Sequence, residues 1–205
     1  TIMKETEITL IRHGETEWNS QQRMQGHSNS DLSAEGRGQI QALGKWMKYV
    51  SFDHIYSSDT LRAMQTAKAI TQYTGHTLHL DKRIREKNLG VFEGLTSNEA
   101  KERFPDVYNL FKTAGRNYVI DKGESTQQLL DRSLEFIEEI RLRHPDQRVV
   151  IVTHGGVVRV LMKHTLGLSI DAPTNFMIKN TGIFGLIWKE NWLVTQMGEV
   201  SHLEK

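Results

Sequence analysis

Short apolar runs alternate with longer segments of mixed polarity along most of the chain. The run at residues 148–153 is apolar without alternation, which is typical of a strand covered on both faces. The other runs are shorter, and residues 77–80 suit an edge strand. The pattern predicts strands at residues 7–11, 54–57, 77–80, 148–153, 183–188 and 192–197. The last two form a hairpin across a polar turn at residues 189–191.

Four longer segments place apolar residues three and four positions apart, which is the spacing of one face of a helix. They lie at residues 32–50, 59–73, 125–143 and 157–166. Ser33 is the expected N-cap of the first helix, and Ser125 with Gln128 forms a capping-box pattern at the start of the third. The last segment is apolar on nearly every side, so it predicts a buried helix.

The order of these elements predicts the architecture. Strands that alternate with helices are typical of a doubly wound α/β domain, so we expect a three-layer α/β/α sandwich with a mostly parallel sheet. No linker or repeat divides residues 1–205, which predicts a single domain. Residues 95–123 break the alternation with short helical pieces and predict a small helical lid insertion over the site. A surface excursion without functional contacts is the alternative.

Composition narrows the class of protein. The chain has 205 residues, of which 38% are hydrophobic and 25% are charged, and its formal net charge is +1. This balance is typical of an ordinary soluble globular protein and gives no basic footprint for nucleic acid. Cysteine is absent, which excludes a disulfide scaffold, a thiol nucleophile and a Cys-ligated zinc site. The histidines lack zinc-type spacing with carboxylates, so we expect no metal.

The sequence shows no targeting segment. Residues 1–5 lack the apolar core of a secretory signal, and no window approaches the ~20 apolar residues of a membrane-spanning helix. We therefore expect a cytoplasmic protein that does not bind membranes. Trp188 or Trp192 would mark the contact of a homodimer if the terminal hairpin exposed either side chain. We expect instead that both are buried in the core.

Candidate chemistry begins with Arg12-His13-Gly14, which follows the first predicted strand. An imidazole at a strand end can attack a phosphoryl group as a nucleophile. The guanidinium beside it can hold phosphate oxygens through paired, charge-assisted hydrogen bonds. Gly14 has no Cβ, so the backbone there can turn sharply and approach a ligand closely.

Two further strand ends carry residues of the same kind. The second predicted strand is followed by Arg62 on the next helix, and the strand before the buried helix is followed by His154-Gly155-Gly156. Ligands gather at the carboxyl ends of strands in open α/β sheets, so these segments should meet. Backbone N–H groups at the start of a helix also favour an anion. Together these groups predict a pocket for a phosphoryl group.

Four segments, read together, resemble the histidine phosphatase superfamily, and more narrowly its phosphoglycerate-mutase-like branch. They are RHGETEWN at residues 12–19, SSDTLRAMQTA at 57–67, RE at 85–86 with GVFEG at 90–94, and THGG at 153–156. The segments follow one another in the order and at the spacing of that family. The resemblance covers nearly the whole chain.

The resemblance implies a role for each matching residue. His13 is the nucleophile that becomes phosphohistidine, and Glu86 is the proton donor to the leaving oxygen. The groups that bind the phosphoryl oxygens are Arg12, Arg62, His154, Asn19, Gln25 and, at the start of the buried helix, Gly155. The family works without a metal.

The expected function is hydrolysis of a small phosphate monoester without a cofactor. Phosphoryl transfer depends mainly on positioning and charge stabilisation, and a proton donor at a poor leaving group accelerates it by ~10²–10⁴-fold. The alternative is a phosphoglycerate mutase, which shares these residues and requires 2,3-bisphosphoglycerate. The short insertion favours the hydrolase. A non-catalytic phosphate-binding module is a third interpretation, disfavoured because binding alone needs neither His13 nor Glu86.

Overall fold

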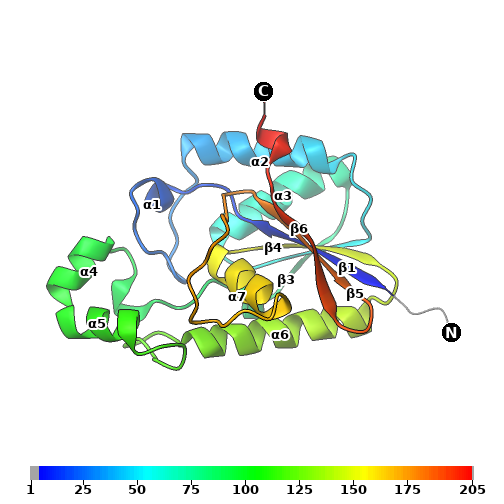
Figure 1. Ribbon diagram of the computed structural model, residues 1–205. Coiled ribbons are helices and arrows are strands. Elements are labelled where there is room, and N and C mark those ends of the chain that lie inside the picture. Colours follow the sequence, from blue (N-terminus) through cyan, green and yellow to red (C-terminus); the bar gives the residue numbers. More distant parts are fainter. Residues whose placement is uncertain (1–4, 205) are drawn as a thin grey trace.

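A six-stranded mixed sheet forms the centre of the molecule, with helices on both faces (Figure 1). The computed structural model describes residues 5–204, so residues 1–4, which belong to the segment expected to lack a secretory signal, and residue 205 lie outside the described range. The strands are β1 (Thr6–Arg12), β2 (His54–Ser57), β3 (Leu78–Leu80), β4 (Arg148–Thr153), β5 (Ile183–Trp188) and β6 (Trp192–Glu199). Their order in the sheet is β3-β2-β4-β1-β5-β6.

The direction of the strands decides where a ligand can bind. Strands β3, β2, β4 and β1 are parallel, whereas β5 is antiparallel to β1 and β6 is antiparallel to β5. The carboxyl ends of the four parallel strands therefore meet at one edge of the sheet. The predicted α/β sandwich with a mostly parallel sheet is confirmed, and so is the terminal hairpin.

The α-helices of the described residues are α1 (Glu17–Ser20), α2 (Ala34–Met47), α3 (Leu61–Thr74), α4 (Ser97–Arg103), α5 (Pro105–Thr113), α6 (Thr126–Arg143) and α7 (Gly155–Thr165). Short 3₁₀ turns occupy Lys82–Ile84, Gly90–Phe92 and Ser201–Leu203. The caps predicted at Ser33 and Ser125 are confirmed, because each side chain accepts a hydrogen bond from a backbone N–H of the first turn.

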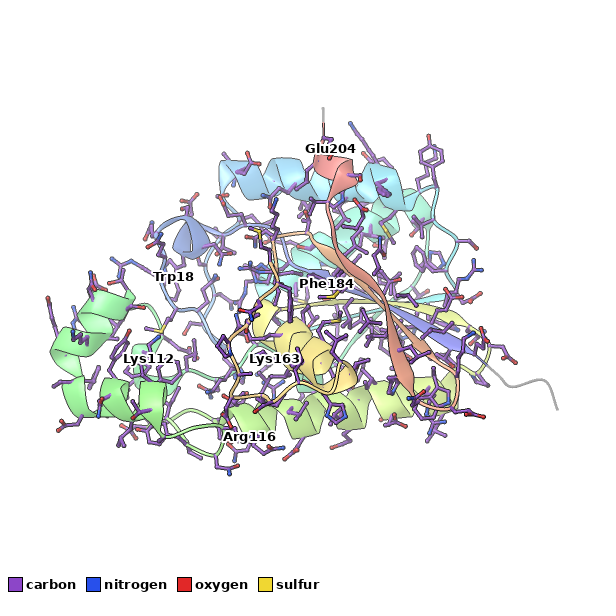
Figure 2. All side chains as sticks on the ribbon, in the orientation of Figure 1. Trp18, Lys112, Arg116, Lys163, Phe184 and Glu204 are labelled. Atoms are coloured by element: carbon purple, nitrogen blue, oxygen red, sulfur yellow. The ribbon has the colours of Figure 1, made fainter. Side chains whose placement is uncertain are left out.

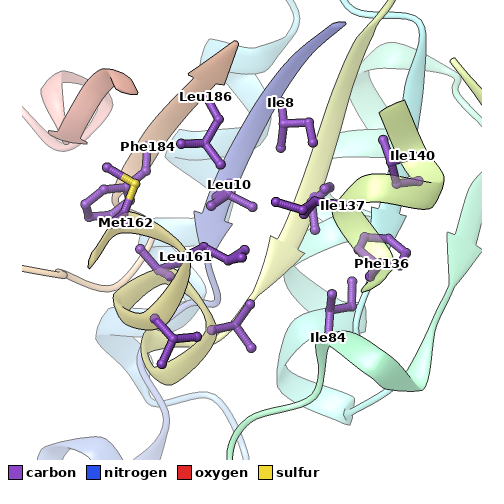
Figure 3. Packing of buried hydrophobic residues seen from close by; sticks show 14 of the residues in the cluster. Ile8, Leu10, Ile84, Phe136, Ile137, Ile140, Leu161, Met162, Phe184 and Leu186 are labelled. Atoms are coloured by element: carbon purple, nitrogen blue, oxygen red, sulfur yellow. The ribbon is translucent and has the colours of Figure 1, made fainter. Parts of the chain in front are cut away.

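The central strands supply both faces of the core because successive side chains of a strand point to opposite sides. Leu10 of β1 and Ile151 of β4 pack with α6 and α7, whereas Ile11 and Val152 pack with α2 and α3. Figure 3 shows the first of these faces, with Leu10 between the side chains of α6 and α7. The absence of polar alternation in β4 thus reflects burial on both faces.

Two helices near the strand ends begin at positions other than those predicted. α7 begins at Gly155, two residues earlier than its apolar pattern indicated, because His154 is an extended N-cap and the glycines already form the first turn. α3 begins at Leu61, two residues later than predicted, after the extended N-cap Thr60. The shift of α7 places its N-terminus directly after the end of β4, where it can face an anion.

The insertion at residues 95–123 contains α4 and α5, which project beyond the sheet (Figure 1). Its apolar side chains gather around the buried Phe92 in a small core of their own. Phe111 of α5 lines the pocket described below. Arg116, which Figure 2 labels, donates to Asp171 at 3.1 Å, and Asp171 belongs to the loop after α7. The insertion therefore borders the site, and its action as a lid stays a prediction.

The terminal hairpin buries Trp192 and leaves Trp188 partly buried. Trp192 is buried in the core, and Trp188 packs edge-on against it with ring centroids 5.4 Å apart. The expected core burial is therefore confirmed for Trp192 and holds in part for Trp188, and a homodimer stays a prediction. Within residues 5–204, no helix has both the length and the apolar composition needed to cross a membrane.

Candidate active site

The carboxyl ends of β1, β2 and β4 open into a pocket of about 360 Å³. Seven of the eight predicted site residues line it, namely Arg12, His13, Asn19, Gln25, Arg62, Glu86 and Gly155. The eighth, His154, lies behind His13, with the centroids of the two rings 5.2 Å apart. The structure thus brings the predicted residues together, although they come from six separate parts of the chain.

His13 is fixed at the end of β1 with one ring nitrogen occupied. Its backbone N–H donates to the Thr153 carbonyl on β4 at 3.0 Å, which anchors the strand end. The ring Nδ1 lies 2.7 Å from the carbonyl oxygen of Gly14, which can only accept, so Nδ1 carries the hydrogen. The lone pair of the neutral ring is therefore on Nε2, the nitrogen left to act as nucleophile.

The environment of His13 keeps it neutral. The residue is 3% exposed. Burial, followed by the nearby charges of Arg62 and Arg12, holds the pKa of His13 well below its usual value. A nucleophile must be unprotonated, so the same cations that would bind a phosphoryl group also maintain the reactive form of the ring.

Gly14 allows close packing against a helix, whereas the sequence predicted a close approach to a ligand. A Cβ at this position would lie 2.6 Å from the Cγ2 atom of Ile40 on α2, so the close approach is to a helix and not to a ligand. The Gly14 N–H donates to the hydroxyl of Thr66 on α3 at 3.0 Å. The glycine therefore lets the end of β1 pack tightly beneath α2 and α3.

Arg12 and Arg62 are held by backbone carbonyls. Arg62 is 1% exposed, and its two terminal nitrogens donate to the carbonyls of Ser28 and Gly26 at 2.8 and 2.7 Å. Arg12 donates through Nη1 to the carbonyl of Ile178 at 2.6 Å. The Nε of each arginine is buried and has no partner among the residues that the structure describes. Anionic oxygens in the pocket would satisfy these donors.

Burial affects the charge of Arg62 without removing it. The pKa of Arg62 falls to about 10, mainly through burial, while the charges of Glu86 and Glu93 act in the opposite direction. A guanidinium with this pKa remains cationic at neutral pH. Arg62 can therefore stabilise phosphoryl charge throughout the physiological range.

His154 is oriented by two hydroxyl groups that follow β2. Its Nε2 lies 2.8 Å from Ser58 Oγ and 3.2 Å from Thr60 Oγ1. When Nε2 accepts from Ser58, Nδ1 carries the hydrogen, and this buried atom has no partner in the described part of the chain. Burial, then the charges of Arg62 and His13, hold the pKa of His154 well below its usual value. A neutral ring with one free N–H can donate to a phosphoryl oxygen.

Thr16 orients the two predicted amide donors. Its backbone N–H donates to Asn19 Oδ1 at 3.1 Å, and its hydroxyl donates to Gln25 Oε1 at 2.9 Å. Because both amide oxygens are occupied, the amide nitrogens are the groups left to meet an anion. A third amide, Asn180, carries no motif and was not predicted; it donates to the His13 carbonyl at 3.0 Å and to Asn19 Oδ1 at 3.4 Å.

Glu86 lies over the first turn of α7. Its Oε2 accepts from the Gly156 N–H at 3.0 Å, and its Oε1 accepts from the Lys87 N–H at 2.7 Å. Each oxygen keeps a further lone pair, at which the carboxyl group can hold a proton. Among the described residues that line the pocket, Glu86 is the one acidic side chain. It is therefore the group available to exchange protons with a bound ester.

A metal site would need several His, Cys, Asp or Glu side chains close together. Within residues 5–204, no group of three or more His, Cys, Asp or Glu side chains is arranged to hold a metal ion. Apart from Glu86, the charged side chains that line the pocket are cations: Arg12, Arg23, Arg62, Lys87, Arg159 and Lys163. Cations and preorganised N–H donors can stabilise a phosphoryl group in transfer.

Comparison with known proteins identifies the family. The model of the histidine phosphatase superfamily (branch 1) matches residues 8–197. Phosphoglycerate mutase-like protein 4 of Arabidopsis thaliana is 35% identical over 202 residues, which are 97% of this chain and 87% of that protein. The solved structure of Bacillus stearothermophilus YhfR has a TM-score of 0.89 and 33% identity, covering 97% of this chain and 100% of that one.

A solved phosphoserine phosphatase mutant from Entamoeba histolytica, in complex with phosphoserine, has a TM-score of 0.86 and 27% identity. The match covers 97% of this chain and 99% of that one. These similarities extend over the whole domain, including every segment that contributes to the pocket. The chain belongs to the histidine phosphatase superfamily, whose phosphatase and mutase-like enzymes it resembles.

Proposed function

We propose that this protein is a phosphomonoester hydrolase that works through a phosphohistidine on His13 and needs no metal or cofactor. The observation that carries the proposal is the state of His13. The ring is buried and neutral, Nδ1 is bound to the Gly14 carbonyl, and Nε2 is free among arginine N–H groups that lack partners. A group that only bound phosphate would not need a neutral imidazole held in this tautomer.

In the first half-reaction, the Nε2 lone pair of His13 attacks phosphorus and forms the P–N bond. The bond between phosphorus and the ester oxygen breaks, and its electron pair goes to the leaving oxygen. The protonated carboxyl of Glu86 gives its proton to that oxygen, so a neutral alcohol departs. Arg12, Arg62 and His154 hold the three other phosphoryl oxygens, with help from Asn19, Gln25 and the Gly155 N–H.

In the second half-reaction, water attacks phosphorus on the side that the alcohol has left. The carboxylate of Glu86 takes a proton from this water, the P–N bond breaks, and its electron pair returns to Nε2 of His13. Inorganic phosphate forms, and both Glu86 and His13 regain their starting protonation states. The same two residues therefore serve both steps.

The outer part of the pocket supports a substrate with a second anionic group. The Lys87 ammonium lies 3.0 Å from the Thr126 hydroxyl and 5.2 Å from the centre of the Phe111 ring. Arg159 of α7 is exposed at the same pocket. Neither cation forms an ion pair within residues 5–204. A carboxylate or second phosphate would pair with them, as phosphoserine, the ligand of the Entamoeba protein, could do.

A phosphoglycerate mutase is the second candidate, because the Arabidopsis relative is called phosphoglycerate mutase-like. The same residues would form the phosphohistidine, and 2,3-bisphosphoglycerate would supply the phosphoryl group. The small insertion at residues 95–123 favours the hydrolase, because a mutase must enclose its bisphosphorylated intermediate and exclude water.

The test is a paired assay of the purified chain with a chelator present. Phosphate release is measured from a panel of phosphomonoesters with and without a second anionic group. Conversion of 3- to 2-phosphoglycerate is measured with and without 2,3-bisphosphoglycerate. We expect fast phosphate release, lost in His13→Ala, with negligible isomerisation. Isomerisation stimulated by the bisphosphate would establish the mutase, turnover that the chelator removes would contradict the metal-free mechanism, and binding without turnover would leave only a phosphate-binding module.

A further inference from the structure

The segment that carries Glu86 is fixed by side chains rather than by regular secondary structure. Residues 85–89 lie between two short 3₁₀ turns and pair with no strand. Side chains of neighbouring elements instead bind the backbone carbonyls of this segment and of the residues just before it. The Ile84 carbonyl, for example, accepts from the Thr153 hydroxyl at 2.8 Å. The position of the Glu86 carboxyl therefore depends on the groups that hold this backbone.

Arg132 of α6 makes the largest share of these contacts. Its Nη1 donates to the carbonyls of Arg83 and Arg85 at 2.6 and 2.7 Å, and its Nη2 donates to the carbonyl of Glu86 at 2.8 Å. A planar guanidinium with donors in a fixed fork is suited to binding several acceptors at once, which an ammonium cannot do with the same geometry.

The other edge of the Arg132 guanidinium is paired with Glu124. The two nitrogen–oxygen distances are 3.2 and 2.5 Å, and the side chains are only 19% and 16% exposed. Glu124 in turn binds the same segment, because its N–H donates to the Asn88 carbonyl at 3.0 Å and its Oε1 accepts from the Asn88 N–H at 3.2 Å. The pair therefore clamps residues on both sides of Glu86.

We infer that Arg132 is a positioning residue for the proton transfer made by Glu86. Arg132 is not among the residues that line the pocket, so it acts through the Glu86 backbone and not on the substrate. It fixes the Glu86 carbonyl, and the carboxyl group then reaches the Gly156 N–H and the leaving oxygen. This inference rests on the proposed role of Glu86 as proton donor.

A residue that positions a general acid has a characteristic effect on leaving groups. A poor leaving group needs the proton, whereas 4-nitrophenolate departs without one. The value of kcat/KM reports the steps up to formation of the phosphohistidine, so it is unaffected by the later hydrolysis. Loss of Arg132 should lower kcat/KM for benzyl phosphate far more than for 4-nitrophenyl phosphate, two substrates of similar size and charge.

The experiment measures kcat/KM for this substrate pair in Arg132→Met, Arg132→Lys and Glu86→Gln. General acids contribute ~10²–10⁴-fold, so misplacing one should cost roughly 10–100-fold with benzyl phosphate and less than about 3-fold with 4-nitrophenyl phosphate. Arg132→Lys keeps the charge without the fork and should show the same selective loss, which preserves the test if Arg132→Met folds poorly. Arg141→Met is the control, because Arg141 forms a similar ion pair on α6, 2.8 Å from Glu138, away from this segment.

The outcomes separate the inference from the proposed function. Equal losses on both substrates, or no loss, in the Arg132 variants would overturn the positioning role. A selective loss in Glu86→Gln but not in the Arg132 variants would overturn this inference and leave the role of Glu86 intact. If Glu86→Gln itself shows no selectivity for the leaving group, the proposed proton donor is wrong.

Discussion

The carboxyl group of Glu86 occupies the space that a side chain at Gly156 would need. A Cβ at residue 156 would lie 2.0 Å from Glu86 Oε1, and the N–H of the same glycine donates to Oε2 at 3.0 Å. The glycine therefore does two things at once: it gives the proposed proton donor room, and it supplies a donor from the first turn of α7.

Gly156→Ala should remove activity while leaving the fold in place. The added methyl group displaces the Glu86 carboxyl, so we expect kcat with an alkyl phosphate to fall by roughly 10²-fold, the lower range for loss of a general acid. Steady-state kinetics and a thermal melt check this. Gly38→Ala is the matched control, because the Cβ there would meet nothing within 4 Å and alanine favours a helix. Unchanged activity in Gly156→Ala would contradict the placement of Glu86.

His13 should keep one tautomer into mildly acidic solution. Its pKa is held well below the usual value of ~6.5 by burial and by Arg62 and Arg12, so Nε2 should stay unprotonated to a lower pH than in an ordinary histidine. NMR spectra of ¹⁵N-histidine-labelled protein measure this directly, with hydrogen on Nδ1 alone. His164, an exposed histidine of α7, is the internal reference in the same spectra. A His13 ring that becomes doubly protonated near pH 6.5 would contradict the structure.

Stability should fall as the pH is lowered from about 7 to 5. Burial lowers the pKa of His13, His154 and His144 in the folded state, so the unfolded chain binds more protons in this range. The contribution is fully present above the unfolded pKa and is lost as the pH falls towards the folded one, by at most about 1.4 kcal/mol per pH unit for each histidine.

Urea unfolding at several pH values measures this dependence, and His144→Gln should make it less steep. Asp59, whose pKa is lowered by its hydrogen bond with Arg85, contributes in a separate range at lower pH. A free energy of unfolding that is constant from pH 7 to 5 would show that the histidines are protonated in the folded protein.

Inorganic phosphate should stabilise the protein through Arg62. At 100 times its Kd, a ligand that binds only the folded state adds about 2.7 kcal/mol, which is roughly 5–10 °C in Tm for a chain of this size. Arg62→Met should abolish the shift and also lower the basal stability by roughly 1–3 kcal/mol, because the carbonyls of Ser28 and Gly26 lose their donor.

Differential scanning fluorimetry with phosphate, and with sulfate as a second anion, checks the prediction. Arg143→Met is the control, because Arg143 forms an exposed ion pair with Glu139 at the C-terminal end of α6, whereas the N-terminal end of α6 lines the pocket. This variant should retain the full shift. A shift that persists in Arg62→Met would place the anion elsewhere.

The strands and the main helices could be predicted from the sequence because each buries a contiguous apolar face. Local patterns also identified the caps at Ser33 and Ser125. The predicted start of α7 was wrong because the two glycines after His154 have little intrinsic preference for a helix. The end of β4 and the contact of Gly156 with Glu86 hold these glycines in the first turn.

The site residues that carry a motif were predicted, whereas the residues that hold them were not. Asn180 binds the carbonyl of His13, 167 positions earlier in the chain, and Arg132 binds the carbonyl of Glu86 at a separation of 46. Such contacts depend on tertiary packing and leave no periodicity or spacing to detect. Ser58 belonged to a recognised segment, but its contact with His154 appears only when β2 and β4 lie side by side.

The alternating side chains of β1 and β4 couple the two layers of helices that cover the sheet. Each of these strands contributes to the apolar clusters on both sides of the sheet, so neither layer of helices can separate without removing the support of the other. The residues proposed to grip the phosphoryl group lie at the ends of the same two strands. A bound substrate should therefore slow the opening of backbone amides far from the pocket, on both layers alike, and hydrogen exchange would register its arrival across the whole domain.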